Sequence, residues 1–330
     1  MLPGLIDLAS ELVGGKALSA SDEFFAPKEN LLKPDAPVFV PDKYTDHGKW
    51  MDGWESRRKR TPGHDWCVIR LGLPGIVRTV DVDTSHFLGN FPEHCSLDGA
   101  SVEHPAKATG DPVEKYWIPM LAKVRLTGGT HNFFDAQHAA RLTHVRLNIF
   151  PDGGVARLRV YGEVVPDLKK LKRSPEPVDV ASVVNGGRVL ASSDNFFGHE
   201  QNLILPGRPI NMGGGWETRR RRGPGYDWII VQLGARAKIQ KISVETEHYQ
   251  GNYPDRCSLD ACDASGTLFQ DLITGKVAWR EIVPAAKLEA NALRQFDSEL
   301  KAAPAVTHVR LNIYPDGGVS RLRVFGKIVD

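Results

Sequence analysis

The chain has 330 residues, 41% of them hydrophobic and 25% charged, which is the balance of a soluble globular protein with room for two domains. The formal net charge is only +2, which argues against binding of nucleic acid through a general basic excess. No apolar run reaches the length of a membrane span, and the N-terminus lacks the pattern of a secretory signal. We therefore expect no nucleic-acid or membrane partner, a cytoplasmic location, and free thiols at the four cysteines.

Stretches of the first half of the chain return in the second half. The matched segments are "LSASDEFFA" (18–26) with "LASSDNFFG" (190–198), "DGWESRRKRTPGHDW" (52–66) with "GGWETRRRRGPGYDW" (214–228), "TSHFLGNFPEHCSLD" (84–98) with "TEHYQGNYPDRCSLD" (246–260), and "THVRLNIFPDGGVARLRVYG" (143–162) with "THVRLNIYPDGGVSRLRVFG" (307–326). Self-similarity at this spacing indicates an internal duplication. The spacing between the copies varies because loops tolerate changes in length.

The repeated segments predict where the domains begin and end. We expect an N-terminal segment over 1–15, a first repeat over 16–164, a linker rich in proline and charge over 165–187, and a second repeat over 188–330.

Each repeat carries the patterns of β-strands. In "HVRLNIYPDGGVSRLRVFG", Val309, Leu311 and Ile313 alternate with polar residues, and the Pro-Asp-Gly-Gly that follows is a turn sequence, so a hairpin is predicted. "DWIIVQLG" and "KIQKISVETEHY" are two more strand candidates. A helical period is persuasive only over 284–303, "PAAKLEANALRQFDSELKAA". The predicted fold class is all-β, with two tandemly repeated jelly-roll β-sandwich domains and a few short helices.

These segments resemble known families. "DWIIVQLG", "KIQKISVET" and the closing "THVRLNI…RLRVFG" are similar to the galactose-binding-like jelly roll of discoidin-type modules. The more specific resemblance is to the allantoicase family, carried by "DGWESRRKR" and "GGWETRRRR", by "SHFLGNFP" and "EHYQGNYP", and by both "RLNI(F/Y)PDGG" segments. That resemblance covers nearly the whole chain and implies two jelly rolls that hydrolyse allantoate to ureidoglycolate and urea in purine (allantoin) degradation.

The chemistry of that reaction asks for a cation, a proton donor and polar groups. Allantoate carries a carboxylate, which arginine binds well in a bidentate manner. We expect Arg57, Arg58, Arg219 and Arg220, which are identical between the copies, to bind the substrate. The adjacent Glu55 and Glu217 are candidate acid/base residues whose pKa the arginines would lower. The alternative is that glutamate and arginine form ion pairs that brace a loop.

Histidine and asparagine recur in the next matched segment. His86 and His248 are candidate acid/base residues because histidine titrates near neutral pH, and each follows a predicted strand. Asn90 and Asn252, four residues later, are candidates for binding the urea oxygen and nitrogen atoms. The alternative is a histidine that caps the strand end and an asparagine that forms a turn with its glycine.

The remaining candidate residues lie in predicted strands, and no residues are assigned to a metal or cofactor. Arg146 and Arg310 lie on the polar side of a predicted strand, where they either bind substrate or face solvent. No metal-binding motif is present, so no metal ligands are assigned, no cofactor is required and metal dependence is left open. Cys95 and Cys257 are expected to be packed thiols in strands.

Two other functions compete with hydrolysis. A non-catalytic tandem discoidin- or lectin-like module would bind an anionic or sugar ligand and would need no positioned acid/base. A nucleic-acid-binding protein has only the arginine run in its favour. The sequence leaves open whether one or both repeats are catalytic, whether sites cross domains or subunits, and whether the chain forms a homo-oligomer.

Overall fold

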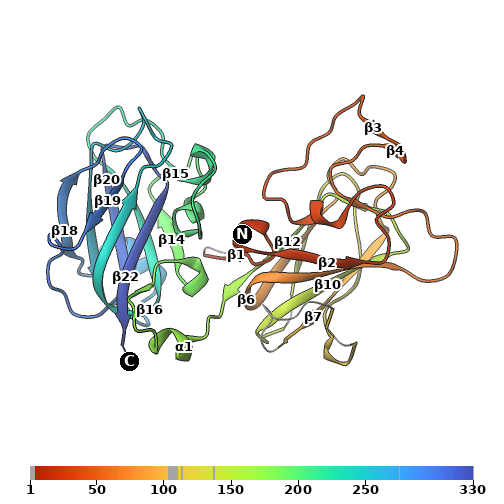
Figure 1. Cartoon of the computed structure of the whole chain (residues 1–330), viewed down its shortest axis with the longest axis horizontal. Helices are drawn as coiled ribbons and strands as arrows, with labels where there is room; N and C mark the ends of the chain where they lie inside the picture. The colour runs from red at the N-terminus through yellow and green to blue at the C-terminus, as the bar shows by residue number, and fades with distance from the viewer. Residues whose placement is uncertain (1–3, 103–110, 113, 137, 275, 330) are drawn as a thin grey trace. The chain divides into compact units, whose positions relative to one another are not determined.

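The computed structural model describes residues 4–102, 111–112, 114–136, 138–274 and 276–329. These form two compact units, one of residues 6–165 and the other mainly of residues 166–329, called here the first and second units (Figure 1). No helix within the described ranges is long and apolar enough to cross a membrane.

The first unit is built almost entirely of strands. They are β1 (Ile6–Asp7), β2 (Lys16–Ala20), β3 (Tyr44–Thr45), β4 (Gly48–Lys49), β5 (Trp54–Glu55), β6 (Asp65–Asp83), β7 (His94–Ala100), β8 (Ile118–Arg125), β9 (His131–Asp135), β10 (Leu142–Phe150), β11 (Gly154–Val155) and β12 (Arg157–Val164). Short 3₁₀ helices are η1 (Glu11–Val13), η2 (Lys28–Leu32) and η3 (Glu114–Tyr116).

One long strand links the two layers of the first unit. The first part of β6 pairs with β2 and β10. On its other side β10 pairs with β7, and β7 pairs with β8. The last part of β6 pairs with β12 and β9, and β12 pairs with β1. All these pairings are antiparallel. The unit is therefore a jelly-roll sandwich in which β6 passes from one sheet to the other.

The second unit repeats this arrangement. Its elements are α1 (Leu168–Lys172), β13 (Val178–Asp179), η4 (Val183–Asn185), β14 (Arg188–Ser192), η5 (Glu200–Ile204), η6 (Met212–Gly214), β15 (Trp216–Glu217), β16 (Asp227–Glu245), β17 (Arg256–Cys262), α2 (Phe269–Ile273), β18 (Arg280–Lys287), β19 (Leu293–Phe296), β20 (Val306–Tyr314), β21 (Gly318–Val319) and β22 (Arg321–Ile328). The long strand is β16, which pairs with β14 and β20 at one end and with β22 and β19 at the other. The prediction of two jelly rolls with few helices is confirmed.

Alternating apolar residues fill the space between the layers. In β20, Val309, Leu311 and Ile313 are fully buried, as the period of two in the sequence predicts. Cys95 and Cys257 lie in β7 and β17 as free, fully buried thiols. Their burial shows that they contribute to packing. It also raises the pKa of each thiol to about 12, far from the range of a reactive thiolate.

The units begin earlier than the repeated sequence suggested. Residues 6 and 7, which we expected in a separate N-terminal segment, form β1 and pair with Gly162 and Tyr161 of β12. In the same way β13, inside the expected linker, pairs with β22. Both short strands belong to the sandwiches because backbone pairing extends the sheet beyond the segments with matched side chains.

Two local predictions were wrong. The segments around the Pro-Asp-Gly-Gly turns are not hairpins, because β20 and β22 pair with β16 on opposite layers and not with each other. The predicted helix over 284–303 instead forms the end of β18 and all of β19, which pair with β17 and β16. Its alanine, lysine and leucine residues favour helix, but sheet pairing and the burial of Leu288 and Phe296 prevail over propensity.

Candidate active site

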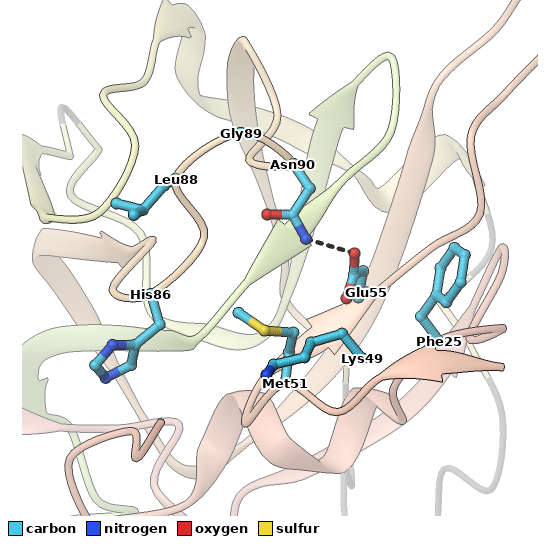
Figure 2. A pocket seen from close by; sticks show the side chains of 8 residues that line it. All are labelled: Phe25, Lys49, Met51, Glu55, His86, Leu88, Gly89 and Asn90. Carbon is cyan, nitrogen blue, oxygen red and sulfur yellow. Dashed lines mark hydrogen bonds between the residues drawn. The ribbon is translucent and has the colours of Figure 1, made fainter. Parts of the chain in front are cut away.

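A cavity of about 300 Å³ opens at one end of the first unit. The residues that line it are Phe25, Lys49, Met51, Glu55, His86, Leu88, Gly89 and Asn90 (Figure 2). They come from the segment before η2, from β4, from the residues that follow it up to and including β5, and from the loop after β6. Three residues predicted from the sequence, Glu55, His86 and Asn90, therefore lie together in one pocket.

A short ladder fixes the backbone of Glu55. β5 pairs with β11, with Glu55 opposite Gly154, and Glu55 also exchanges backbone hydrogen bonds with Ala26. The neighbouring Trp54 is fully buried, and its indole Nε1 donates to the Asp22 carbonyl at 2.9 Å. A large anchored side chain beside a two-residue strand holds the Glu55 side chain toward the pocket.

The Glu55 carboxyl is buried without a cationic partner. Glu55 is 8% exposed, and its Oε1 accepts a 2.7 Å hydrogen bond from Asn90 Nδ2 (Figure 2). Burial raises the pKa of Glu55 above its ordinary value, and the Asn90 hydrogen bond offsets this only in part. The expected lowering of this pKa by the adjacent arginines is wrong because no arginine pairs with Glu55 in the described part of the chain. A buried carboxyl of raised pKa keeps its proton to a higher pH than an exposed one, which favours a role as a proton donor.

His86 contacts the loop that forms one wall of the pocket. Its Nε2 lies 3.1 Å from the Pro37 carbonyl oxygen, and its ring stacks on Phe39 with centroids 5.7 Å apart. The backbone of His86 is in the left-handed region, with φ of 70°. The second unit repeats both features, since His248 has φ of 73° and its Nε2 lies 3.0 Å from the Pro209 carbonyl oxygen. This repeated contact indicates a role in holding the loop, and the predicted proton transfer by either histidine stays a prediction.

The paired arginines divide into two kinds. Arg57 donates from its backbone N–H and its Nε to the Asp22 carboxylate, each at 2.8 Å, and stacks over Phe24. Arg219 makes the same contacts with Asp194 and Phe196. The bracing ion pair considered from the sequence therefore exists, but with an upstream aspartate in place of glutamate. Arg58 and Arg220 are exposed and have no hydrogen bond or ion pair with any described residue.

The third basic residue of each run also braces the loop. Lys59 Nζ donates to the Asp65 carboxylate at 2.7 Å, and Arg221 pairs with Asp227. Both aspartates are 1% exposed, so a cation beside each offsets the cost of burying its charge.

The second unit keeps the glutamate–asparagine pair, with a methionine beside its amide. Asn252 Nδ2 donates to Glu217 Oε1 at 2.5 Å. The same amide lies 3.9 Å from Met212 Sδ, and the Met212 carbonyl accepts a 2.8 Å hydrogen bond from Tyr249 Oη. Met212 therefore lies beside Asn252, while Glu217 itself is half-buried and more exposed than Glu55. In the first unit the equivalent pair lines the cavity.

Arg146 and Arg310 lie elsewhere, on the sheet formed by β7 and β10 and on its counterpart. Arg146 pairs with Asp98 at 3.0 Å and with Glu114 at 2.8 Å, and Arg310 pairs with Asp260 at 2.8 Å. Neither lines the pocket around Glu55. Their carboxylate partners occupy them, and their predicted contact with substrate stays a prediction.

The described residues contain no group of three or more histidine, cysteine, aspartate or glutamate side chains that could hold a metal ion. The expectation that no cofactor is required stays a prediction. Phe25, Lys49 and Met51 also line the pocket and were not predicted; Phe25 lies in a matched segment, whereas Lys49 and Met51 do not. Lys49 and Met51 follow a segment that is longer in the first copy, and this difference in length is the signal that could have identified them.

Comparisons with known proteins agree with the repeated fold. A family model described as the allantoicase repeat matches residues 6–165 and 178–329. The chain is 51% identical over 332 residues to a probable allantoicase of Rhizobium meliloti, with 99% of this chain and 95% of the relative covered. It is 49% identical over 323 residues to probable allantoicase 1 of Burkholderia mallei, with 98% and 94% covered. The crystal structure of allantoicase from Saccharomyces cerevisiae superposes with a TM-score of 0.82 at 34% identity, with 98% of this chain and 93% of that chain covered.

Two jelly-roll repeats, both matched by the family model, define the class of protein. The chain belongs to the allantoicase family. Its membership covers both repeats, so the reading as a non-catalytic tandem binding module is not favoured.

Proposed function

We propose that this chain hydrolyses allantoate to ureidoglycolate and urea, and that the pocket of the first unit is where this occurs. The observation that carries the assignment is Glu55, a buried carboxyl of raised pKa that faces a cavity and has an amide, not a cation, as its partner. Membership of the allantoicase family supports the substrate and the reaction.

The reaction needs one group that first gives and then accepts a proton. Allantoate carries its carboxylate and two ureido groups on a single carbon. The Glu55 carboxyl protonates the departing ureido nitrogen while the other ureido nitrogen donates electrons, so that the C–N bond breaks and urea leaves. Water then adds to the imine-like carbon, and the Glu55 carboxylate accepts the proton that this water loses. One water is consumed, and the acid returns to its starting state.

Asn90 supports both halves of this cycle. Its Nδ2 donates to Glu55, and its Oδ1 points away from Glu55, where it can accept a hydrogen bond from a ureido N–H (Figure 2). Arg58, whose guanidinium is uncommitted within the described residues, adds positive charge close in sequence to Glu55 and attracts the anionic substrate. His86 holds the loop through the Pro37 carbonyl.

The test is urea release from allantoate by the purified chain and by two matched variants. Glu55→Gln keeps the shape and the Asn90 hydrogen bond but removes the proton, so kcat should fall by about 10²–10⁴. Glu217→Gln makes the same change in the second unit and should leave kcat close to that of the parent, because Glu217 is less buried than Glu55 and Met212 lies against its asparagine partner. Absence of urea release by the parent chain would refute the activity. Equal losses in the two variants would refute the choice of the first unit.

The cellular setting is also proposed. The four cysteines are free thiols, which fits the reducing cytoplasm. Cell fractionation with an antibody to the chain tests this location. Assembly into a homo-oligomer is left open.

A further inference from the structure

The wall of the pocket differs in length between the two copies. The first has 28 residues between Phe25 and Trp54, and the second has 18 between Phe197 and Trp216. The longer segment includes residues 33–53, called here the pocket loop, with the β3–β4 hairpin near its end (Figure 1). Lys49, the last residue of β4, lines the cavity.

Buried polar contacts fix the pocket loop at both ends. Arg157, which is 1% exposed, donates from Nη2 to the Asp52 carboxylate at 2.7 Å and from Nε to the Asp35 carbonyl at 3.0 Å. The same carboxylate accepts the Val38 N–H at 3.1 Å. Between these two ends, the Pro37 carbonyl oxygen lies within hydrogen-bond distance of His86 Nε2. The loop therefore has a defined position against the sandwich, and so does the strand that carries Lys49.

The Lys49 ammonium contacts aromatic rings and a carbonyl oxygen but has no counter-ion among the described residues. Its Nζ lies 5.1 Å from the Phe39 ring centroid and 4.9 Å from that of Tyr44, and it donates to the Pro41 carbonyl. No carboxylate pairs with it in the described ranges of the chain. Among the described residues that line the pocket, Lys49 is the only lysine or arginine. The second copy has Asn211 at the matched position, where the side chain accepts the Gly213 N–H and begins η6.

These contacts suit an anionic ligand beside an acid. A carboxylate entering the pocket supplies the missing counter-ion in a partly desolvated place, where a charge-assisted hydrogen bond is strong. Arg57 cannot take this role without giving up Asp22, and Arg58 does not line the cavity. We propose that Lys49 binds the carboxylate of allantoate and that this contact, present only in the first unit, limits productive binding to its pocket. This proposal rests on the proposed hydrolysis of allantoate.

The test is direct binding, measured by calorimetry in a Glu55→Gln background so that turnover does not interfere. Two ligands are compared: allantoate, and its amide, in which a neutral carboxamide replaces the carboxylate. Adding Lys49→Met should weaken allantoate binding by about 10- to 100-fold and leave amide binding nearly unchanged. Lys49→Arg, which keeps the charge, should retain most of the affinity.

Lys43→Met is the matched control. It removes the same charge from the same loop, but Lys43 stacks over Trp50 and does not line the cavity, so binding of both ligands should be unchanged. The melting temperature of each variant reports its folding. Unchanged allantoate binding in Lys49→Met, or an equal loss for acid and amide, would overturn the proposal. Failure of the hydrolysis itself would appear separately, as an absence of urea release by the parent chain.

Discussion

Replacing Asp52 with asparagine removes the charge that holds the pocket loop to the sandwich. The Asp52 carboxylate accepts hydrogen bonds from Arg157 Nη2 at 2.7 Å, from the Val38 N–H at 3.1 Å and from Lys33 Nζ at 3.2 Å. Asparagine keeps an acceptor for Val38 but leaves the Arg157 charge buried without a carboxylate. Removing one partner of a buried ion pair typically costs about 3–5 kcal/mol.

The lower end of that range applies here. Arg157 retains hydrogen bonds to the carbonyls of Asp35, Asp52 and Ala156, so its donors are not left empty. A loss of about 3 kcal/mol should lower the melting temperature of a unit of this size by about 6–12 °C. Differential scanning calorimetry at pH 7 measures this change.

Lys33→Met is the control, because it removes the partly exposed arm of the same network. The Lys33 side chain is 42% exposed, so its pair with Asp52 should contribute at most about 1 kcal/mol. A decrease in melting temperature for Asp52→Asn no larger than that for Lys33→Met would refute the importance of the buried pair.

The pH dependence gives an independent check on Asp52. Burial alone would raise its pKa, but the hydrogen bonds from Arg157 and Val38 and the Arg157 charge hold the pKa below 3.8. A carboxyl with a lowered folded-state pKa contributes stability above its unfolded value and loses it as the pH falls through the folded value. The difference between parent and Asp52→Asn should therefore shrink below about pH 3.8.

Three other predictions follow from the contacts of the first unit and of the thiols. Because burial raises the pKa of Glu55 above 4.5, the stability tied to its proton is present below pH 4.5 and lost as the pH rises through the raised pKa. Glu55→Gln should therefore melt above the parent at pH 7, with a gap that narrows toward pH 4; an equal gap at both pH values would contradict this. Arg58→Gln should lower kcat/KM by less than about tenfold at low salt, and the effect should vanish near about 0.5 M salt if Arg58 attracts the substrate from outside the pocket. The four thiols, each at most 5% exposed, should not react with Ellman's reagent in the folded chain and should all react in denaturant; rapid reaction of the folded chain would show that the packing is wrong.

The sequence predicts the fold class well because duplication shows every strand pattern twice. The alternation in "THVRLNIY" is buried in β20 as expected, and its partner sequence is buried in β10. The sequence does not predict which strands pair with each other. A turn sequence such as Pro315 to Gly318 shows that the chain reverses, but not whether the two strands share a layer. Similarly, the apolar spacing over 284–303 fits a helix or a pair of strands, and only pairing with β16 and β17 decides between them.

The candidate site was predicted in part. Matched segments identified Glu55, His86 and Asn90, which meet in the cavity, but they equally identified Arg57 and Arg146, which have carboxylate partners. Duplication copies structural and functional residues alike, so repetition alone cannot separate them. The partners that tie up these arginines come from other segments of the chain, and their proximity depends on the tertiary fold.

The two units show how one framework gives two different surroundings to the same pair of side chains. In each, a buried tryptophan with its Nε1 on an aspartate carbonyl fixes a two-residue strand, and the following glutamate meets an asparagine. The loop before that strand then determines what the glutamate faces. Each loop contacts the histidine of its own unit, but the short loop brings Met212 against Asn252, whereas the longer one leaves a cavity lined by Lys49. Because the glutamate–asparagine pair is the same in both units, the difference in chemistry that we propose depends on its surroundings: ten additional residues of loop in the first unit, and the buried Arg157–Asp52 pair that holds this loop in place.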